Sequence, residues 1–258
     1  MSSEGSRWPA PRLIGTTGST NDDAATLARD GAPEGTCVVA DEQTAGRGRL
    51  DRTWVSPAGA GLWMSVLVRP GSVDAGRIAW LPLVAGLAAT DALKRAVSVR
   101  AEVKWPNDIV VSPVACGGSG GPRKLGGILS VLHPDAGGSR AVVLGIGMNV
   151  AMDSAHLPIP TATSVLLEGG TPDRTALLAA LLVGLERRIA QWRAGDVAVE
   201  TDYRDRCATI GRLVRVELPS GDRLSGIATG IDADGHLIVE DGETTSRITA
   251  GDVIHATI

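Results

Sequence analysis

The sequence predicts an α/β protein with a central mixed sheet that carries helices on one face, followed by a small all-β barrel. Two observations lead to this prediction. Segments with strand-like and helix-like spacing of apolar residues alternate over roughly the first 209 residues. From Gly211 to Ile258, apolar and polar residues instead alternate with a period of two between short turns. We therefore expect two domains, at residues 1–209 and 210–258, the second SH3-like in size.

The elements of the first domain follow from apolar periodicity and from the residues that begin and end helices. Ser19 or Thr20 is expected to cap a helix that ends near Gly31, and Pro172 to stand near the first position of a later helix. The further helix ranges are 77–96, 172–192 and about 197–207. The expected strands are 36–40, 62–68, two short ones within 103–111, then 124–132 and 141–150, with a loop rich in Gly, Ser and Pro at 112–122.

The expected barrel consists of short strands separated by turn residues. Its strand ranges are 213–218, 224–231, 236–240, 244–248 and 253–257. Peptide-binding SH3 domains line their groove with aromatic residues, whereas residues 211–258 contain no Phe, Tyr or Trp. A peptide-binding module with the rest of the chain as its scaffold is therefore the weaker reading of this segment.

The composition argues against several classes of protein. The formal net charge is −4 and the pI is about 5.6, whereas a general nucleic-acid binder would carry a basic excess. Cys37, Cys116 and Cys207 are widely spaced without a CxxC pair, which argues against a disulfide framework or a zinc site. The histidines are scattered, so no residue is assigned to a metal. No signal peptide or membrane-spanning segment is visible, and we expect a cytoplasmic protein without membrane or nucleic-acid partners.

A polar loop, Gln43–Trp54, begins with the run Gln-Thr-Ala-Gly-Arg-Gly-Arg-Leu. Its glycines allow tight turns that present N–H groups to an anion, and Arg47 and Arg49 add guanidinium groups suited to phosphate or carboxylate oxygens. Taken alone, a solvated loop with incidental arginines explains the run equally well. No Walker-type GxxxxGK[ST] run is present, so ATP would not be held by a P-loop.

Three further segments lie at expected strand ends. In the Lys-Trp-Pro-Asn-Asp run at 104–108, the Asn can hydrogen-bond a base or ribose and the Asp can bind a metal or accept a proton, although by itself a simple turn explains the pair better. Lys124, followed by two glycines, offers a cation beside backbone that a ligand can approach closely. The Gly-Ile-Gly-Met-Asn run at 145–149 lacks the third glycine of GxGxxG and a following helix, so we reject a dinucleotide-binding fold.

Together these segments closely resemble the biotin–protein ligase family. The order and spelling match: a Ser-Thr-Asn helix start, GRGR, KWPND, RKLGGI, GIGMN and then Ala-Thr-Ser at 162–164. The resemblance covers roughly residues 13–258 and implies a catalytic domain like that of class II aminoacyl-tRNA synthetases, with a C-terminal SH3-like barrel. It also implies that biotin and ATP react, with Mg²⁺, to give biotinyl-5'-AMP. Biotin would then pass to a lysine of the biotin carboxyl carrier domain of acetyl-CoA or propionyl-CoA carboxylase.

The resemblance also assigns roles to individual residues. The implied catalytic groups are Arg49, Lys124 and Asp108, and Asp108 is our candidate for helping to deprotonate or position the attacking lysine. The residues implied to bind biotin are Ser19, Thr20, Asn21, Gln43, Gly46, Arg47, Arg49, Lys124, Gly127 and Gly145. Those implied to bind ATP are Arg47, Arg49, Arg52, Trp54, Lys104, Asn107, Lys124 and Asn149, with Trp54 packing over the adenine.

The chain departs from the family pattern at three places. The Ser112–Arg123 connection is longer than usual, and Leu50 stands where the family commonly has an arginine, for which Arg52 could substitute. Only about a dozen residues precede the segment that resembles the family, so we expect a ligase without the N-terminal DNA-binding domain of the repressor-type members. Two alternatives stay open: a lipoate–protein ligase, which shares the broader fold, and a biotin-sensing binding protein without efficient transfer.

Overall fold

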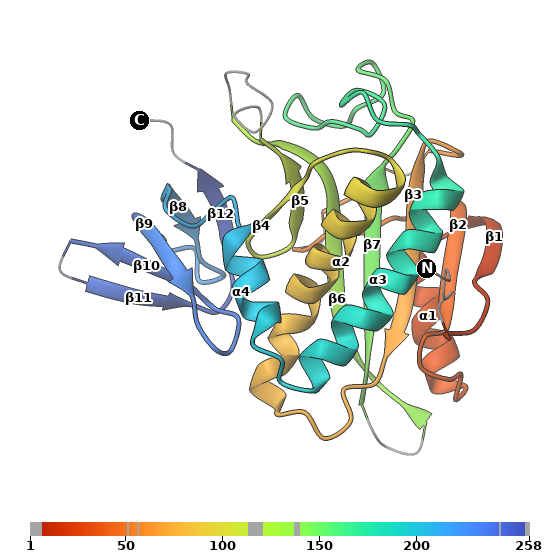
Figure 1. Ribbon diagram of the computed structural model, residues 1–258, viewed down its shortest axis with the longest axis horizontal. Coiled ribbons are helices and arrows are strands. Elements are labelled where there is room, and N and C mark those ends of the chain that lie inside the picture. Colours follow the sequence, from red (N-terminus) through yellow and green to blue (C-terminus); the bar gives the residue numbers. More distant parts are fainter. Residues whose placement is uncertain are drawn as a thin grey trace.

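The computed structural model of the chain describes residues 7–50, 52–55, 57–112, 121–136, 140–242 and 244–255. Its larger sheet contains β1 (Arg12–Thr17), β2 (Cys37–Gln43), β3 (Gly61–Val68), β4 (Glu102–Lys104), β5 (Asp108–Val111), β6 (Arg123–Pro134) and β7 (Arg140–Asn149). Their order across the sheet is β1-β2-β3-β7-β6-β5-β4 (Figure 1). The β1–β2 pair is parallel and the other neighbouring pairs are antiparallel, so the predicted mixed sheet is confirmed.

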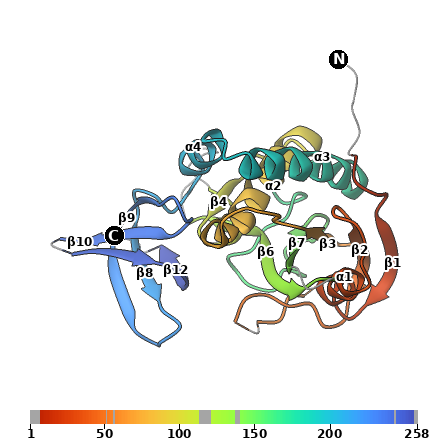
Figure 2. The same ribbon diagram turned by 90° about the horizontal axis from the view of Figure 1, so that it is seen from below.

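The helices are α1 (Thr20–Arg29), α2 (Leu81–Ala96), α3 (Arg174–Arg193) and α4 (Ala198–Asp205), with a 3-10 helix, η1 (Ala75–Trp80), before α2. The prediction of helices on one face holds for α2 and α3, whereas α1 lies on the opposite face (Figure 2). Alternating residues of β3 follow this division, since Val66 and Val68 share a core with α2 and α3 and Leu67 packs with α1. Because both faces are covered, β3 is buried along its whole length and is a continuous apolar run instead of an alternating one.

Capping residues and proline set the helix starts. Ser19 is the N-cap of α1, as predicted. The prediction that Pro172 stands near the first position of a helix is wrong, because α3 begins at Arg174 with Asp173 as its N-cap. The Asp173 carboxylate accepts hydrogen bonds from two backbone N–H groups of the first turn, and this outweighs the weaker preference of proline for a helix start. Pro82 lies in the first turn of α2, so the expected helix 77–96 divides into η1 and α2.

The second sheet contains β8 (Leu213–Glu217), β9 (Arg223–Ile231), β10 (Leu237–Asp241), β11 (Thr244–Ile248) and β12 (Asp252–His255). It is antiparallel in the order β11-β10-β9-β8-β12, as expected for the SH3-like barrel. It packs on the first domain through two indole N–H groups: Trp80 donates to the carbonyl of Ala233 (2.8 Å) and Trp105 to that of Gly235 (3.0 Å). Both sheets contribute to one hydrophobic core, and the boundary at 209/210 stays a prediction.

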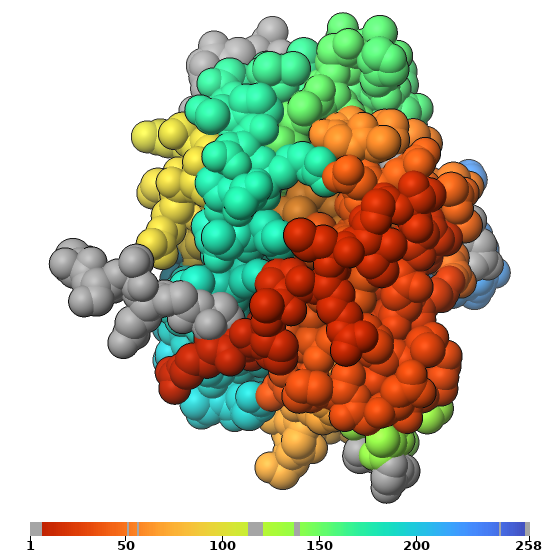
Figure 3. All heavy atoms as spheres, turned by 90° about the vertical axis from the view of Figure 1, so that its right-hand side faces the viewer, coloured from red at the N-terminus to blue at the C-terminus, as the bar shows by residue number. Residues whose placement is uncertain are grey.

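The periphery of the molecule is less regular. Figure 3 looks onto the edge of the larger sheet at β1, where Leu13 is 75% exposed. Most of the expected Gly/Ser/Pro loop lies outside the described residues, so its prediction is not tested. Within the described ranges, no helix is both long enough and apolar enough to cross a membrane.

Candidate active site

A cavity of about 410 Å³ lies between the loop Gln43–Trp54, the strands β5, β6 and β7, and the barrel. The predicted site residues that line it are Ser19, Thr20, Asn21, Gln43, Arg47, Arg49, Arg52, Trp54, Lys104, Asn107, Asp108, Lys124, Gly127, Gly145 and Asn149. Gly46 is the exception. It is a buried residue of the loop itself, and its carbonyl accepts a hydrogen bond from the N–H of Trp54 (2.8 Å). The structure therefore brings nearly all of the predicted residues to one place and gives Gly46 a role in the shape of the loop.

One end of the cavity holds a network of uncharged polar side chains at the start of α1. The backbone N–H of Thr20 donates to Oε1 of Gln43 (2.9 Å), and its Oγ1 lies 2.7 Å from the Oγ of Ser65. Ser65 in turn donates to Oδ1 of Asn21 (2.5 Å). Sequence reasoning missed Ser65. A signal was present, since Ser65 carries the only hydroxyl in the otherwise apolar strand β3.

The floor of the cavity is glycine backbone of β6 and β7. A Cβ on Gly145 would lie 2.1 Å from Oδ1 of Asn21, and a Cβ on Gly147 would lie 2.9 Å from the indole of Trp54. The same indole covers Gly127, where a Cβ would lie 3.2 Å away. In this structure the flat group that rests on the glycine backbone is the indole of Trp54, over Gly127 and Gly147, and the amide of Asn21 lies against Gly145.

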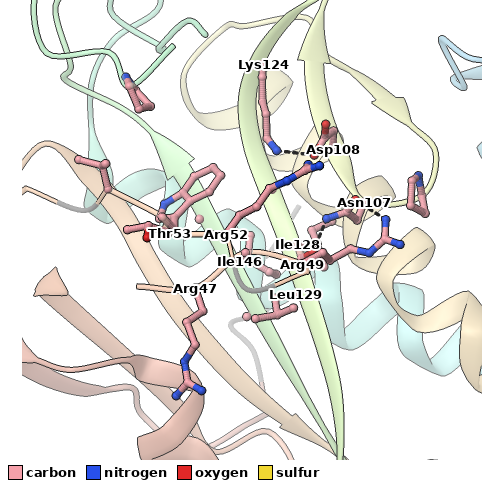
Figure 4. Close-up of a pocket in the computed structure, with 18 of the residues that line it drawn as sticks. Arg47, Arg49, Arg52, Thr53, Asn107, Asp108, Lys124, Ile128, Leu129 and Ile146 are labelled. Carbon is pink, nitrogen blue, oxygen red and sulfur yellow. Dashed lines mark hydrogen bonds and ion pairs between the residues drawn. The ribbon is translucent and has the colours of Figure 1, made fainter. Parts of the chain in front are cut away.

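The other end of the cavity carries positive charge. Nζ of Lys124 forms an ion pair with Oδ1 of Asp108 (2.6 Å), and Nη1 of Arg49 donates to Oδ1 of Asn107 (3.2 Å). Asn107 also donates to a backbone carbonyl of β6 (2.8 Å), which fixes the orientation of its amide. Figure 4 shows these side chains, together with Arg52, gathered on one side of the cavity.

The electrostatic environment of this end differs from that of bulk water. Burial lowers the pKa of the Arg49 guanidinium and of the Lys104 ammonium, while the carboxylates Asp252 and Asp108 act against this effect. Charges in a partly dehydrated space interact more strongly than they do in water. The cationic end is therefore suited to a polyanion such as a triphosphate.

Two loop arginines are engaged by protein carboxylates. Arg47 points away from Arg49 and Arg52 in Figure 4 and forms an ion pair with Asp22 of α1. Arg52 forms an ion pair with Asp252 of β12. The structure therefore separates Arg47, which pairs with Asp22 on the α1 side of the cavity, from the other two arginines, although the three stand close together in the sequence.

Asn149 lies at the end of β7 and is buried in the cavity wall. Its Nδ2 donates to the carbonyl of Thr163 (2.9 Å), within the Ala-Thr-Ser run that the sequence singled out. The same run continues next to Lys124, whose backbone exchanges hydrogen bonds with Thr161 (2.7 Å) and Thr163 (2.8 Å). The segment 161–163 thus holds both Asn149 and Lys124 in place.

The barrel contributes to the cavity as well, through residues that sequence reasoning did not name. Glu217 of β8 and Asp252, Val253 and Ile254 of β12 line it. A period-two pattern identifies strands, but it does not say which strand will face another domain. No local signal could have found these residues.

The described residues contain one group of three side chains suited to hold a metal ion together, namely Asp232, Asp234 and His236. This group lies in the barrel and does not line the cavity. Arg247 forms ion pairs with both aspartates, so the cluster already contains its own cation. We draw no function from it.

Comparisons with known proteins show the family of the chain. A profile described as the Biotin/lipoate A/B protein ligase family matches residues 16–149, and one described as the Biotin protein ligase C terminal domain matches residues 209–256. The chain is similar to a biotin–[acetyl-CoA-carboxylase] ligase of Mycobacterium tuberculosis, with 42% identity over 97% of this chain and 91% of the relative. It is also similar to one of Paracoccus denitrificans, with 33% identity over 93% and 98%.

Solved structures show the same likeness. A biotin protein ligase from Aquifex aeolicus in complex with biotin and ATP matches with a TM-score of 0.80 and 24% identity, over 96% of this chain and 100% of that one. One from Leishmania major in complex with biotinyl-5-AMP matches with a TM-score of 0.62 and 26% identity, over 94% and 99%. The first of these matches shows a similar fold only. The assignment to a family rests on the sequence matches. The chain therefore belongs to the biotin/lipoate A/B protein ligase family and, within it, to the biotin–protein ligases.

Proposed function

We propose that the chain catalyses ATP-dependent biotinylation: it forms biotinyl-5'-AMP and then transfers biotin to a lysine of a biotin carboxyl carrier domain. The layout of this cavity is the observation that supports the proposal most. Uncharged hydrogen-bonding groups lie at one end, glycine backbone forms the floor, and Arg49, Lys104 and Lys124 lie at the other end. This order suits an acid with an uncharged polar head, a compact fused ring system and a terminal carboxylate that must meet a triphosphate.

The uncharged end distinguishes biotin from lipoate. The ureido group of biotin has one carbonyl and two N–H groups, and Thr20, Asn21 and Gln43, which line the cavity, carry both donors and acceptors that can bind it. Ser65 lies behind them and holds Thr20 and Asn21 in place. Lipoate ends in a dithiolane ring without strong donors or acceptors. It would leave these buried polar groups without ligand partners, which costs affinity. We therefore favour biotin over lipoate.

Replacing Gly145 by alanine should raise the Kd for biotin about tenfold or more. The added Cβ would lie 2.1 Å from Oδ1 of Asn21, so this side chain would have to leave its place beside Ser65. Overpacking of this kind costs about 1–3 kcal/mol, and each 1.4 kcal/mol is a factor of ten in Kd. Isothermal titration with biotin measures the change.

Gly15→Ala in β1 is the matched control, because a Cβ there meets nothing within 4 Å. If the Kd were unchanged in Gly145→Ala as well as in the control, the uncharged end of the cavity would not be part of the biotin site.

In the first chemical step, a carboxylate oxygen of biotin forms a bond to the α-phosphorus of ATP. The bond from this phosphorus to the bridging oxygen of the departing pyrophosphate breaks. Both reactants are anions, so the reaction needs cations at the place where they meet. Arg49 and Lys124 are the groups that we assign to this task, and Asn107 holds the first of them through a hydrogen bond (3.2 Å). Closure of the loop Gln43–Trp54 would then keep water from the mixed anhydride.

In the second step, the amine of the carrier lysine attacks the acyl carbon, the new C–N bond forms, and AMP leaves with the anhydride oxygen. The attacking amine must lose a proton. Asp108 is a cavity-lining carboxylate beside Lys124, and we propose that it accepts this proton or positions the amine.

Asp108→Asn should slow transfer from preformed biotinyl-AMP about 10²-fold, the lower range for loss of a general base. Single-turnover transfer to the carrier domain measures this step apart from adenylate formation. The rate of adenylate formation in the same variant serves as the internal comparison. A normal transfer rate would show that Asp108 neither accepts the proton nor positions the amine.

We propose that Mg²⁺ binds together with ATP. Proteins often bind Mg²⁺ through one or two carboxylates together with substrate phosphates. Asp108 and Asp252 are carboxylates that line the cationic end of the cavity, so the residues fit an ion that arrives on the triphosphate. When bound, the ion would neutralise part of the phosphate charge.

We further propose that the acceptor is the carrier domain of acetyl-CoA or propionyl-CoA carboxylase, in keeping with the names of the relatives from M. tuberculosis and P. denitrificans. We also infer a cytoplasmic location. Cys37 and Cys207 are buried and unbridged, and unbridged cysteines are typical of a reducing compartment.

The decisive test is incorporation of labelled biotin into a purified carrier domain with Mg-ATP, with labelled lipoate in a parallel reaction. Transfer of biotin and not of lipoate is the expected result. Transfer of lipoate would place the chain with the lipoate ligases. Tight biotin binding without any transfer would indicate a biotin-sensing protein.

A further inference from the structure

The segment 161–163 lies between the ends of strands β6 and β7. On the β7 side, pairing with β6 extends only as far as Met148. Beyond this point, the backbone of Lys124 is bonded to the segment in the manner of a parallel strand. On the other side, the carbonyl of Asn149 accepts a hydrogen bond from the N–H of Val165 (3.0 Å), just after the segment. The segment therefore occupies the position of a short strand between two residues of the cavity.

Thr163 is the residue through which the segment is held. The preceding residues, 151–160, form neither a helix nor a strand, so the chain enters the segment without regular structure. Thr163 is buried, and each of its polar groups has a partner. Its N–H donates to the carbonyl of Lys124, its carbonyl accepts from Nδ2 of Asn149, and its hydroxyl donates to the Glu168 carboxylate. A shift of Thr163 would therefore be felt at both strand ends.

Glu168 is a fixed partner for this hydroxyl. Its side chain is only 7% exposed, and its N–H donates to the carbonyl of Ser164 (3.0 Å). The turn that follows rests directly on the end of α2, since a Cβ on Gly170 would lie 2.5 Å from the carbonyl oxygen of Val97. The N–H of Thr171 donates to the same carbonyl (3.2 Å). The carboxylate thus belongs to a turn anchored on the main core.

Arg123 is the second partner of this carboxylate. It donates to Oε2 of Glu168 (3.0 Å), whereas Thr163 donates to Oε1. The Arg123 side chain is 44% exposed. Because the two bonds use different oxygens, the bond to Thr163 does not depend on Arg123.

The amide of Asn149 is the group that depends most on Thr163. Among the described residues, its side chain has no hydrogen-bond partner other than the Thr163 carbonyl. A carbonyl only accepts, so the amide nitrogen must face Thr163, and the amide oxygen stays available as an acceptor for a ligand in the cavity. Lys124, in contrast, is also held by its pairing with Val110 of β5 and by Asp108.

We propose that Glu168 is a positioning residue for ATP: it holds the hydroxyl of Thr163, and Thr163 in turn fixes the orientation of the Asn149 amide at the cavity. The inference rests on the proposed function where it names ATP. The fixing of the segment 161–163 concerns the protein without ligands, and it can be tested whatever the enzyme activates.

Glu168→Ala should raise the KM for ATP about three- to tenfold, the range for loss of one hydrogen bond, in biotin-dependent exchange of labelled pyrophosphate into ATP. The Kd for biotin, measured by titration without ATP, should stay unchanged, because Thr20 and Gln43 lie at the other end of the cavity. ITP carries an oxo group in place of the 6-amino group of ATP, so it offers no donor to the Asn149 oxygen. The ratio of the KM values for ITP and ATP should therefore move toward unity when the amide is free to turn.

Conservative variants separate this role from general destabilisation. Glu168→Gln keeps an acceptor for the Thr163 hydroxyl and Thr163→Ser keeps the hydroxyl, so both should retain a KM for ATP close to that of the wild type. Thr163→Val removes the same bond from the other side at nearly constant volume and should match Glu168→Ala. The double variant of Thr163→Val and Glu168→Ala should be no worse than either single one, because both changes remove one contact.

Asp153→Ala is the matched control. Asp153 is an exposed carboxylate of the same connection, it bonds within its own turn to Ala155 and His156, and it does not line the cavity. Its loss should leave the KM for ATP and the Kd for biotin unchanged.

Hydrogen–deuterium exchange of the full-length protein without ligands tests the fixing of the segment directly. Glu168→Ala should speed exchange of peptides that cover residues 161–168 about threefold or more, and Asp153→Ala should not. Unchanged exchange in Glu168→Ala would overturn the proposal. An unchanged KM for ATP in both Glu168→Ala and Thr163→Val would do so too, as would a parallel rise in the Kd for biotin. A wild type without biotin-dependent pyrophosphate exchange, but with the expected deuterium exchange, would instead overturn the proposed function alone.

Discussion

Replacing Lys124 by alanine should lower the rate of biotinyl-AMP formation about 10²–10³-fold, the range for loss of one group that stabilises charge in a transition state. Lys124 is the cation at the start of β6 that lies beside Asp108 (2.6 Å) and 5.4 Å from the ring centroid of Trp54. Its loss leaves Asp108 without this partner in a space that must also take a carboxylate and a triphosphate. Arg49→Ala should have an effect of the same order.

Biotin-dependent exchange of labelled pyrophosphate into ATP measures the adenylation step. Arg123→Ala is the matched control, because Arg123 is the neighbouring cation and forms an ion pair with Glu168 (3.0 Å) without lining the cavity. It should retain most of the activity. If the Lys124 and Arg123 variants lost activity equally, the cause would be the fold of β6 and not the charge in the cavity.

Asp91→Ala should lower the free energy of unfolding by about 3 kcal/mol, the lower limit for breaking a buried ion pair. Asp91 on α2 forms ion pairs with Arg187 (2.8 Å), Arg188 (2.9 Å) and Arg206 (2.5 Å), and so ties α2 to α3 and to the end of α4. The side chain of Arg188 is only 3% exposed. It keeps a second partner, Asp202, which is why we expect the lower limit.

For a domain of this size, such a loss corresponds to a fall in Tm of about 6–12 °C. Asp205→Ala on α4 is the control, because Asp205 is exposed near the same network, and it should shift the Tm little. A fall in Tm below about 2 °C for Asp91→Ala would mean that water or neighbouring groups compensate the lost carboxylate.

The contribution of Asp91 should also depend on pH. Burial by itself would raise the pKa of this carboxyl, but hydrogen bonds from Arg206 and Arg188 prevail and hold it below its ordinary value. A carboxyl with a lowered pKa in the folded state stabilises the protein at neutral pH and loses this contribution as pH falls through the folded pKa. The difference in Tm between wild type and Asp91→Ala should therefore be full at pH 7 and shrink below about pH 4.

Much of the fold was predictable because its signals are local. Ser19 has the side-chain type of an N-cap, the period-two segments after Gly211 form strands, and the KWPND run joins two short strands at its turn. Helix ends were predicted less well. Pro172 was a reasonable start for α3, but the Asp173 carboxylate accepts hydrogen bonds from two N–H groups of the first turn, and the helix begins two residues later, at Arg174. Which of two neighbouring residues starts a helix depends on the backbone geometry at that point, and the sequence pattern does not give this geometry.

The sequence alone predicted which residue types would form the site, because glycines leave backbone open to close approach and arginine and lysine bind anionic oxygens wherever they occur. Tertiary structure decided how they meet. It placed α1 on the face opposite α2 and α3, and thereby brought Ser65 of β3 into the network with Asn21. It also docked the barrel so that Asp252 reaches Arg52, a partner 200 residues away in the chain. Contacts at such separations depend on the packing of whole sheets, and no short pattern of residues records that packing.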